Sequence, residues 1–268
     1  MNNKNNHELF EFLKYHKRIT GPDSWVDHIP FVKYLINIKK SNLIVELGTH
    51  TGNSFCGILE AIKEFQPSSK AYAIDTWEGD DHAGFYEDSV FTNLNKYIED
   101  NYSQNGFLIR KRFDEALNMF SDNSIDILHI DGLHTYEAVK NDFVTWRSKV
   151  KSDGVILFHD TCVLKDGFGV HIFWEEIKDD FINYNFLFGN GLGVISLDLN
   201  NTSEVNILLR NLNENIMYQG FFSELANNRQ LKNLLKKSNY KLENVRKSRF
   251  IKIWNFLRKS FGIKTIEL

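Results

Sequence analysis

Four acidic residues stand where short apolar runs of the sequence end. They are Glu46, Asp75, Asp131 and Asp160, and His159 directly precedes the last of them. Because ligands bind at the carboxyl ends of the strands in open α/β sheets, we expect these side chains to converge on one rim. Carboxylates and an imidazole brought together in this way can bind a divalent cation, accept hydrogen bonds from hydroxyl groups and move a proton.

The segment 43–54 passes from an apolar strand through Gly48 and Gly52 into a helix. The first glycine permits a sharp turn, and the second lets backbone N–H groups approach a ligand. The spacing does not follow the Gly-x-Gly-x-x-Gly pattern of pyrophosphate-binding turns. The loop therefore favours a nucleoside cofactor without a diphosphate.

Asp75 ends the second strand, 23 residues after Gly52. This position suits a carboxylate that accepts hydrogen bonds from ribose hydroxyls, and the neighbouring Trp77 could stack on a base. The alternative is that Asp75 caps the loop or helix that follows it.

Strands alternate with helices along the middle of the chain, which predicts right-handed crossovers and a mostly parallel sheet covered on both faces. A hairpin signal at 189–191 predicts an antiparallel pair at the end. The fold class is thus α/β, a Rossmann-like, doubly wound, mostly parallel seven-stranded sheet with a C-terminal antiparallel hairpin. The expected strands are 43–47, 71–75, 107–110, 125–130, 155–158 and two within 186–197, and the expected helices are 53–65, 90–102, 136–150 and 173–181.

Composition and charge divide the chain into three predicted parts: an N-terminal helical cap (1–40), a cofactor-binding domain (41–200) and a basic helical tail (201–268). Residues 229–268 carry 12 Lys and Arg against 2 Glu, whereas the rest of the chain carries 20 basic and 33 acidic residues. Within the tail, apolar residues between 250 and 261 recur at helical spacing among basic ones, which predicts a basic amphipathic helix. Such a tail could fold back on the acidic body, bind an anionic membrane surface, contact a partner or another copy of the chain, or remain a solvated helix.

No apolar run approaches the roughly 20 residues of a membrane span, and residues 1–8 lack the pattern of a signal peptide. The two cysteines, Cys56 and Cys162, show neither zinc-site nor disulfide spacing. We therefore predict a cytoplasmic protein, with peripheral association at the inner membrane surface through the tail left open.

Four motifs occur in order along the chain: Val-Glu-Leu-Gly-Thr-His-Thr-Gly-Asn-Ser at 45–54, Ala-Ile-Asp-Thr-Trp at 73–77, Ile-Asp-Gly-Leu-His-Thr-Tyr at 130–136 and Gly-Val-Ile-Leu-Phe-His-Asp-Thr at 154–161. Through them the chain resembles class I S-adenosylmethionine-dependent methyltransferases, in the branch that contains macrolide-sugar O-methyltransferases and glycan- and antibiotic-biosynthesis methyltransferases. The resemblance covers roughly residues 25–197.

This resemblance implies that residues of the first motif surround the methionine part of S-adenosylmethionine and that Asp75 holds its ribose. The expected cofactor-binding residues are Glu46, Gly48, Thr49, Gly52, Ser54, Asp75, Thr76 and Trp77. The segment 112–114, Arg-Phe-Asp, departs from the family's signal for seating adenine.

Methyl transfer to oxygen requires an in-line approach and a nucleophile that loses its proton. Asp131 and Asp160 make an oxygen-rich half-site for Mg²⁺, which would lower the pKa of a bound hydroxyl, and His159 is the expected third ligand. His134, three residues after Asp131, is the expected general base. Its alternative role is a helix-cap histidine that is hydrogen-bonded to Asp131.

The leading functional prediction is an enzyme that methylates a hydroxyl of a sugar or glycosylated natural product. A nicotinamide-dependent oxidoreductase on the same sheet is one alternative, and a non-catalytic methyltransferase-like scaffold that binds a nucleoside or glycan is another. The acidic body argues against a nucleic-acid acceptor. Assembly into a homo-oligomer is left open.

Overall fold

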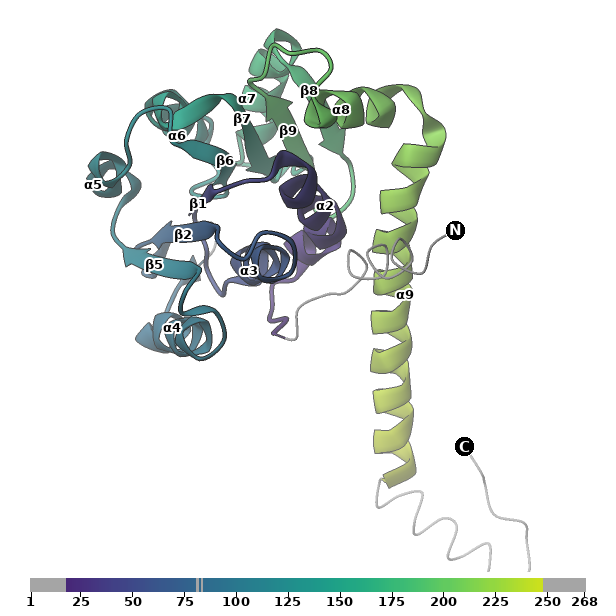
Figure 1. Ribbon diagram of the computed structural model, residues 1–268. Coiled ribbons are helices and arrows are strands. Elements are labelled where there is room, and N and C mark those ends of the chain that lie inside the picture. Colours follow the sequence, from purple (N-terminus) through teal and green to yellow (C-terminus); the bar gives the residue numbers. More distant parts are fainter. Residues whose placement is uncertain (1–17, 81, 83, 248–268) are drawn as a thin grey trace, which may run out of the picture. The chain divides into compact units, whose positions relative to one another are not determined.

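The computed structural model describes residues 18–80, 82 and 84–247 (Figure 1). The chain divides into two compact units, residues 1–223 and 224–268. The predicted boundaries at residues 40 and 200 stay predictions. The amphipathic segment 250–261 lies outside the described residues.

Within the first unit, seven strands form one sheet in the order β5-β2-β1-β6-β7-β9-β8. Only β9 runs against the others among the described strands, because it pairs antiparallel with both β7 and β8. The predicted fold class is confirmed. The strands are β1 (Leu43–Leu47), β2 (Lys70–Asp75), β5 (Gly106–Arg110), β6 (Ile125–Ile130), β7 (Val150–His159), β8 (Ile182–Phe186) and β9 (Leu192–Ser196), and a separate two-residue hairpin joins β3 (Gly79–Asp80) to β4 (Gly84–Phe85).

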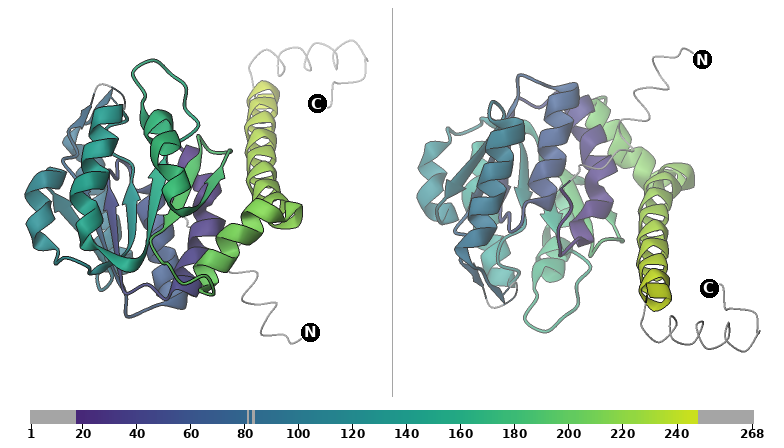
Figure 2. Two further views of the ribbon diagram at one scale, coloured as in Figure 1. Left: turned by 90° about the horizontal axis from the view of Figure 1, so that it is seen from above. Right: turned by 90° about the horizontal axis from the view of Figure 1, so that it is seen from below.

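Helices cover both faces of the sheet (Figure 2). On one face lie α2, α3 and α4, and on the other lie α6 and α7. The helices are α2 (Ile29–Lys39), α3 (Asn53–Phe65), α4 (Asp88–Tyr102), α5 (Phe113–Ala116), α6 (Tyr136–Trp146), α7 (Val170–Ile177), α8 (Glu204–Glu214) and α9 (Ile216–Lys247), with short 3₁₀ turns at Ser24–His28, Leu117–Met119, Arg147–Lys149 and Lys178–Asp180. None of the described helices has both the length and the apolar composition of a membrane span.

Continuous apolar runs explain why the central strands lie in the middle of the sheet. All six residues of β6 are buried, which is the pattern of a parallel strand covered on both sides. Its buried Asp126 has partners for both carboxylate oxygens. It accepts hydrogen bonds from the backbone N–H groups of Asn42 and Leu43, and it forms an ion pair with Lys151. The sheet is therefore a rigid base for the residues that follow its strand ends.

Several predicted boundaries were wrong, and the helices expected at 136–150 and 173–181 are Tyr136–Trp146 and Val170–Ile177. The strand expected at 155–158 begins at Val150, because its first residues pair with Ile125 before a register shift. The first hairpin strand ends at Phe186 rather than beginning there, and residues 187–191 form the connection to β9. This longer connection reaches the site described below.

Candidate active site at the carboxyl ends of the strands

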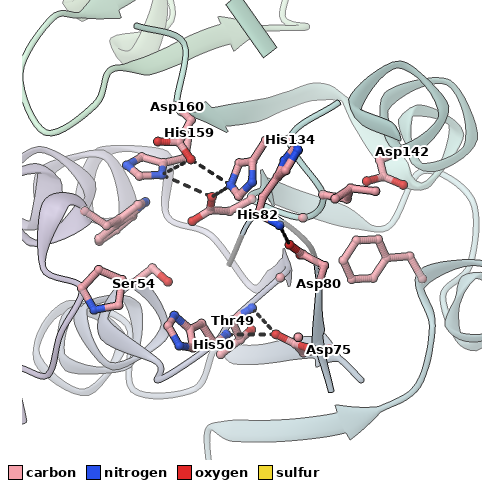
Figure 3. Close-up of a pocket in the computed structure, with 18 of the residues that line it drawn as sticks. Thr49, His50, Ser54, Asp75, Asp80, His82, His134, Asp142, His159 and Asp160 are labelled. Atoms are coloured by element: carbon pink, nitrogen blue, oxygen red, sulfur yellow. Dashed lines mark hydrogen bonds and ion pairs between the residues drawn. The ribbon is translucent and has the colours of Figure 1, made fainter. Parts of the chain in front are cut away.

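A cavity of about 820 Å³ opens at the carboxyl ends of β1, β2, β6 and β7 (Figure 3). Its walls include residues from all four predicted motifs. The lining residues of the expected site are Gly48, Thr49, Ser54, Asp75, Thr76, Asp131, His134, His159 and Asp160. The structure thus brings most of the expected residues to one cavity.

Gly48 turns the chain at the end of β1 with a φ of 84°. A Cβ atom at this position would stand 2.0 Å from the carbonyl oxygen of Asp131. The N–H of Asp131 in turn donates to the carbonyl of Leu47 at 2.8 Å. The loop after β1 and the loop after β6 therefore touch through backbone alone, which only glycine allows.

Asp75 organises the glycine loop. Its Oδ2 accepts hydrogen bonds from the backbone N–H groups of Thr49 and His50 at 2.8 and 2.9 Å, and its Oδ1 accepts one from the N–H of Trp77 at 2.7 Å. The carboxylate also lines the cavity, and each of its oxygens has more than one acceptor site. It can hold the loop and still accept a hydroxyl group from a ligand.

Trp77, the residue expected to stack on a base, is buried behind the glycine loop and does not reach the cavity. Its side chain is 1% exposed, does not line the cavity and packs against Phe91. Its indole N–H donates to the carbonyl of His50 at 2.9 Å. Trp77 thus holds the glycine loop through this hydrogen bond, a role that its place in the sequence did not reveal.

Glu46 lies behind the cavity wall in a buried chain of hydrogen bonds. The indole N–H of Trp25 donates to Nε2 of His129 at 3.0 Å, so Nδ1 of that imidazole carries the proton that faces Glu46 Oε2, also at 3.0 Å. Glu46 Oε1 has no hydrogen-bond partner among the described residues. Glu46 is fully buried and does not line the cavity, whereas Trp25 does.

The side chain of Asn53 links the glycine loop to Thr20 and Pro22, in the segment before α2, through hydrogen bonds. Its side-chain amide donates to the carbonyls of Thr20 and Pro22, each at 2.7 Å, and its Oδ1 accepts from the N–H of Thr20 at 3.0 Å. Pro22 and Ser24 consequently line the cavity beside Ser54. The sequence contained Asn53 within a motif but gave no sign of this contact.

The three residues Asp131, His134 and Asp160 form a cluster in which one ligand atom from each lies within 4.8 Å of the others. His134 Nε2 is 2.8 Å from Asp160 Oδ2 and 3.8 Å from Asp131 Oδ1. Asp160 Oδ1 and His134 Nδ1 are buried and make no hydrogen bond within the described part of the chain. Asp160 has a φ of 60°, a backbone strain of the kind that collects at functional sites.

Opposite charges control protonation in this cluster. Burial alone would raise the pKa of the Asp131 carboxyl, but the charge of His159 and hydrogen bonds from both histidines hold it well below its usual range. Burial would lower the pKa of His134, but hydrogen bonds to Asp131 and Asp160 raise it to about 9. At neutral pH a proton therefore lies between His134 and the two carboxylates, in the position where a cation could replace it.

Both ring nitrogens of His159 have partners in the structure. Its Nε2 lies 3.0 Å from the carbonyl of Gly189, which can only accept, and its Nδ1 lies 3.2 Å from Asp131 Oδ1. Burial opposes a charge on this imidazole, but the neighbouring Asp131 raises its pKa well above the usual value. In the structure the third member of the cluster is His134, whereas His159, the expected third ligand, lies behind it with Nδ1 3.2 Å from Asp131 Oδ1 and 3.5 Å from Asp160 Oδ2.

The hairpin between β8 and β9 supplies contacts that the sequence analysis missed. The carbonyl of Gly189 also accepts from Nε2 of His28 at 3.1 Å, and a Cβ atom at Gly189 would stand 2.5 Å from the carbonyl of Ser24. Burial lowers the pKa of His28 to about 3, so it is neutral. Asn190 follows in the same turn and lines the cavity.

Two outer loops meet over the cluster. The ring of Phe168 stacks with both His82 and His134, at centroid distances of 4.7 and 4.8 Å, and the two imidazoles lie 5.8 Å apart. All three residues line the cavity. The loop after β2 reaches this edge of the site through His82.

The family comparison agrees with this arrangement. Residues 45–161 match the family model of a methyltransferase domain. The match begins in β1 and ends just after Asp160, so it contains the glycine loop, Asp75 and the cluster.

One curated relative is a protein of Sinorhizobium fredii, named uncharacterized protein y4gI, which is 39% identical over 172 residues. The match covers 64% of this chain and 19% of that protein, so the chain spans about a fifth of the relative's length.

Among solved structures, a methyltransferase from Geobacter sulfurreducens is 16% identical with a TM-score of 0.48, over 63% of this chain and 76% of that one. An O-methyltransferase from Bacillus cereus in complex with SAH is 12% identical with a TM-score of 0.49, over 73% and 92% of the two chains. The O-methyltransferase TomG from Streptomyces achromogenes, in complex with SAM, is 12% identical with a TM-score of 0.46, over 66% and 80%.

Proposed function

We propose that the chain is an S-adenosylmethionine-dependent methyltransferase that methylates a hydroxyl oxygen of a sugar or glycosylated natural product, in the branch of macrolide-sugar O-methyltransferases. One observation carries the proposal. The cluster of Asp131, His134 and Asp160 faces the same cavity as Asp75 and the glycine loop. A nucleoside-binding loop and a group of acid–base residues that share one cavity favour an enzyme over a scaffold.

The residues of the glycine loop fit the cofactor. S-adenosylmethionine, when bound, supplies the methyl group on its sulfonium. In this proposal Asp75 accepts the ribose hydroxyls, and Thr49, whose buried Oγ1 lacks a hydrogen-bond partner in the described chain, binds the sugar or the methionine part. Glu46 Oε1 likewise has no hydrogen-bond partner among the described residues. In this proposal its carboxylate, behind the cavity wall, stabilises the positive charge of the methionine part of the cofactor.

The donor set of the cluster also fits a divalent cation, because two carboxylates and an imidazole are suitable ligands. Asp131 and Asp160 would hold Mg²⁺, which would bind an acceptor hydroxyl and make it more acidic. His134 is the proposed base in its neutral form, which becomes populated as the pH rises toward its pKa of about 9. The alternative role of His134 is the third ligand, and a variant described in the Discussion separates the two.

Calorimetric titration with S-adenosylhomocysteine tests the cofactor assignment. We expect wild type to bind it, and Asp75→Asn to bind it about tenfold or more weakly, because an amide presents N–H groups to the backbone donors of Thr49 and His50. Asp153→Asn is the matched control. That carboxylate is exposed, pairs with Lys39, and lies in β7 away from the strand's carboxyl end, where the cavity opens. Equal affinities in wild type and Asp75→Asn would remove Asp75 from the cofactor site, and no binding by wild type would refute the proposed function.

For the basic tail we propose attraction to an anionic membrane surface, supported by the excess of Lys and Arg in residues 229–268. Deletion of residues 246–268 is expected to reduce sedimentation with phosphatidylglycerol vesicles and to leave affinity for S-adenosylhomocysteine unchanged. Equal sedimentation of the full chain and the shortened chain would reject membrane binding by this segment.

A further inference from the structure

The loop 160–169, which connects β7 to α7, contacts His134 on two sides. Asp160, the first residue of the loop, meets the edge of the imidazole, with Oδ2 2.8 Å from Nε2. Phe168, near the other end of the loop, meets the face of the imidazole, with the ring centroids 4.8 Å apart and the ring planes 15° from parallel. One loop therefore contacts both the edge and the face of the proposed base.

The loop ends on the backbone of the residue that it covers. The N–H of Gly169 donates to the carbonyl of His134 at 2.8 Å, and the N–H of Phe168 donates to the carbonyl of Lys165 at 3.0 Å. A Cβ atom at Gly169 would stand 2.3 Å from the backbone nitrogen of Tyr136, so the end of the loop abuts the start of α6 without a side chain between them. The backbone next to Phe168 is thus fixed relative to His134.

The ring of Phe168 is also held from other directions. It stacks on His82 with the planes 13° from parallel, and Nζ of Lys165 lies 5.6 Å from its centroid. In Figure 3 the ring of His82 lies beside that of His134. Phe168 therefore joins the loop after β2 to the loop after β7 over the acid–base cluster.

Polar contacts alone leave much of the His134 ring unrestrained. Its Nε2 has one close partner, Asp160, and lies 3.8 Å from Asp131 Oδ1, whereas Nδ1 is buried and has no hydrogen-bond partner among the described residues. A side chain with one such contact can rotate between staggered conformers unless packing prevents it. The packing that His134 has against its ring face comes from Phe168.

We propose that Phe168 is a positioning residue for methyl transfer, whose ring holds the imidazole of His134 so that Nε2 faces Asp131 and Asp160 while Nδ1 stays covered. This inference rests on the proposed function, in which His134 is the base. A base must lie within hydrogen-bond reach of the proton that it removes, and a displacement of about 1 Å can lower the rate about a hundredfold. Phe168 itself moves no proton and acts only through His134.

Nuclear magnetic resonance of protein labelled with ¹³C in its histidines tests the position of the ring without an acceptor. The Cε1–H resonance of His134 is identified as the one that is missing in His134→Gln. We expect one narrow resonance in wild type and in Phe168→Tyr, which keeps the aromatic face. In Phe168→Leu we expect a broadened or doubled resonance, because the imidazole then exchanges between conformers.

Steady-state methyl transfer from S-adenosylmethionine to a panel of methyl pyranosides measures the effect on turnover. Phe168→Leu is expected to lower kcat about tenfold to a hundredfold and to leave KM within about threefold, and Phe168→Tyr is expected to restore kcat. Affinity for S-adenosylhomocysteine should stay within about threefold of wild type in both variants, because the ring contacts of Phe168 are with the two histidines and Lys165 rather than with the glycine loop. Phe85→Leu is the matched control, since Phe85 carries the same side chain but is 82% exposed.

A narrow His134 resonance together with an unchanged kcat in Phe168→Leu would overturn the inference and leave the proposed function intact. A loss that Phe168→Tyr does not restore, or one that brings an equal loss of cofactor affinity and a lower melting temperature, would also overturn it, because a purely structural role gives that result. Failure of wild type to bind S-adenosylhomocysteine would refute the proposed function instead. The His134 resonance of the unliganded chain would then still decide whether Phe168 holds the ring.

Discussion

Replacing Asp160 by Asn is expected to slow methyl transfer by about a thousandfold, while affinity for S-adenosylhomocysteine stays within about threefold of wild type. The carboxylate lies 2.8 Å from His134 and, in the proposed function, provides the negative charge that holds a cation and orients the base. It lies past β7, away from Asp75 and the glycine loop. Its loss should therefore affect the chemical step rather than cofactor binding.

Single-turnover kinetics and Mg²⁺ titration calorimetry would measure this result. Asp122→Asn is the control, because that carboxylate is exposed and pairs with Lys149, away from the cavity. His134→Gln distinguishes the two roles of His134: a base is needed for turnover but not for Mg²⁺ affinity, whereas a ligand is needed for both. Full activity in Asp160→Asn would exclude the cluster from catalysis.

Replacing Gly48 by Ala is expected to lower the free energy of unfolding by about 3 kcal/mol or more and to abolish cofactor binding. The new methyl group would stand 2.0 Å from a carbonyl oxygen in the loop after β6, and no side chain can move aside to relieve the contact. The φ of 84° adds a further cost for any residue with a Cβ atom.

Gly84→Ala isolates the cost of the backbone conformation alone. Gly84 has nearly the same φ, 82°, but a Cβ atom there would meet nothing within 4 Å. We expect this variant to lose about 1–2 kcal/mol in urea unfolding. Equal losses in the two variants would show that the contact between the loops does not matter.

Much of the site was predictable because strand ends in a parallel sheet share one edge. Apolar runs located Asp75, Asp131 and Asp160, and their meeting at one cavity followed from the alternation of strands and helices. The glycine loop was equally visible, since its two glycines have positive φ values that few other residues adopt.

The exchange of His159 for His134 was not predictable from spacing. It depends on the carbonyl of Gly189, which is 30 residues away from His159 in the sequence and occupies its second nitrogen. Likewise, the burial of Trp77 depends on Phe91 and on the backbone of His50. Such contacts arise from tertiary packing and leave no local pattern.

The backbone contact between Gly48 and Asp131 limits which parts of the cavity wall can change independently. Because the two loops abut without an intervening side chain, a displacement of one must displace the other. The donor-binding half and the acid–base half of the cavity therefore behave as a single rigid part. In the proposed function, the outer segments that carry His82, Phe168 and Asn190 are the parts of the cavity wall where acceptor preference can change without loss of the methyl donor.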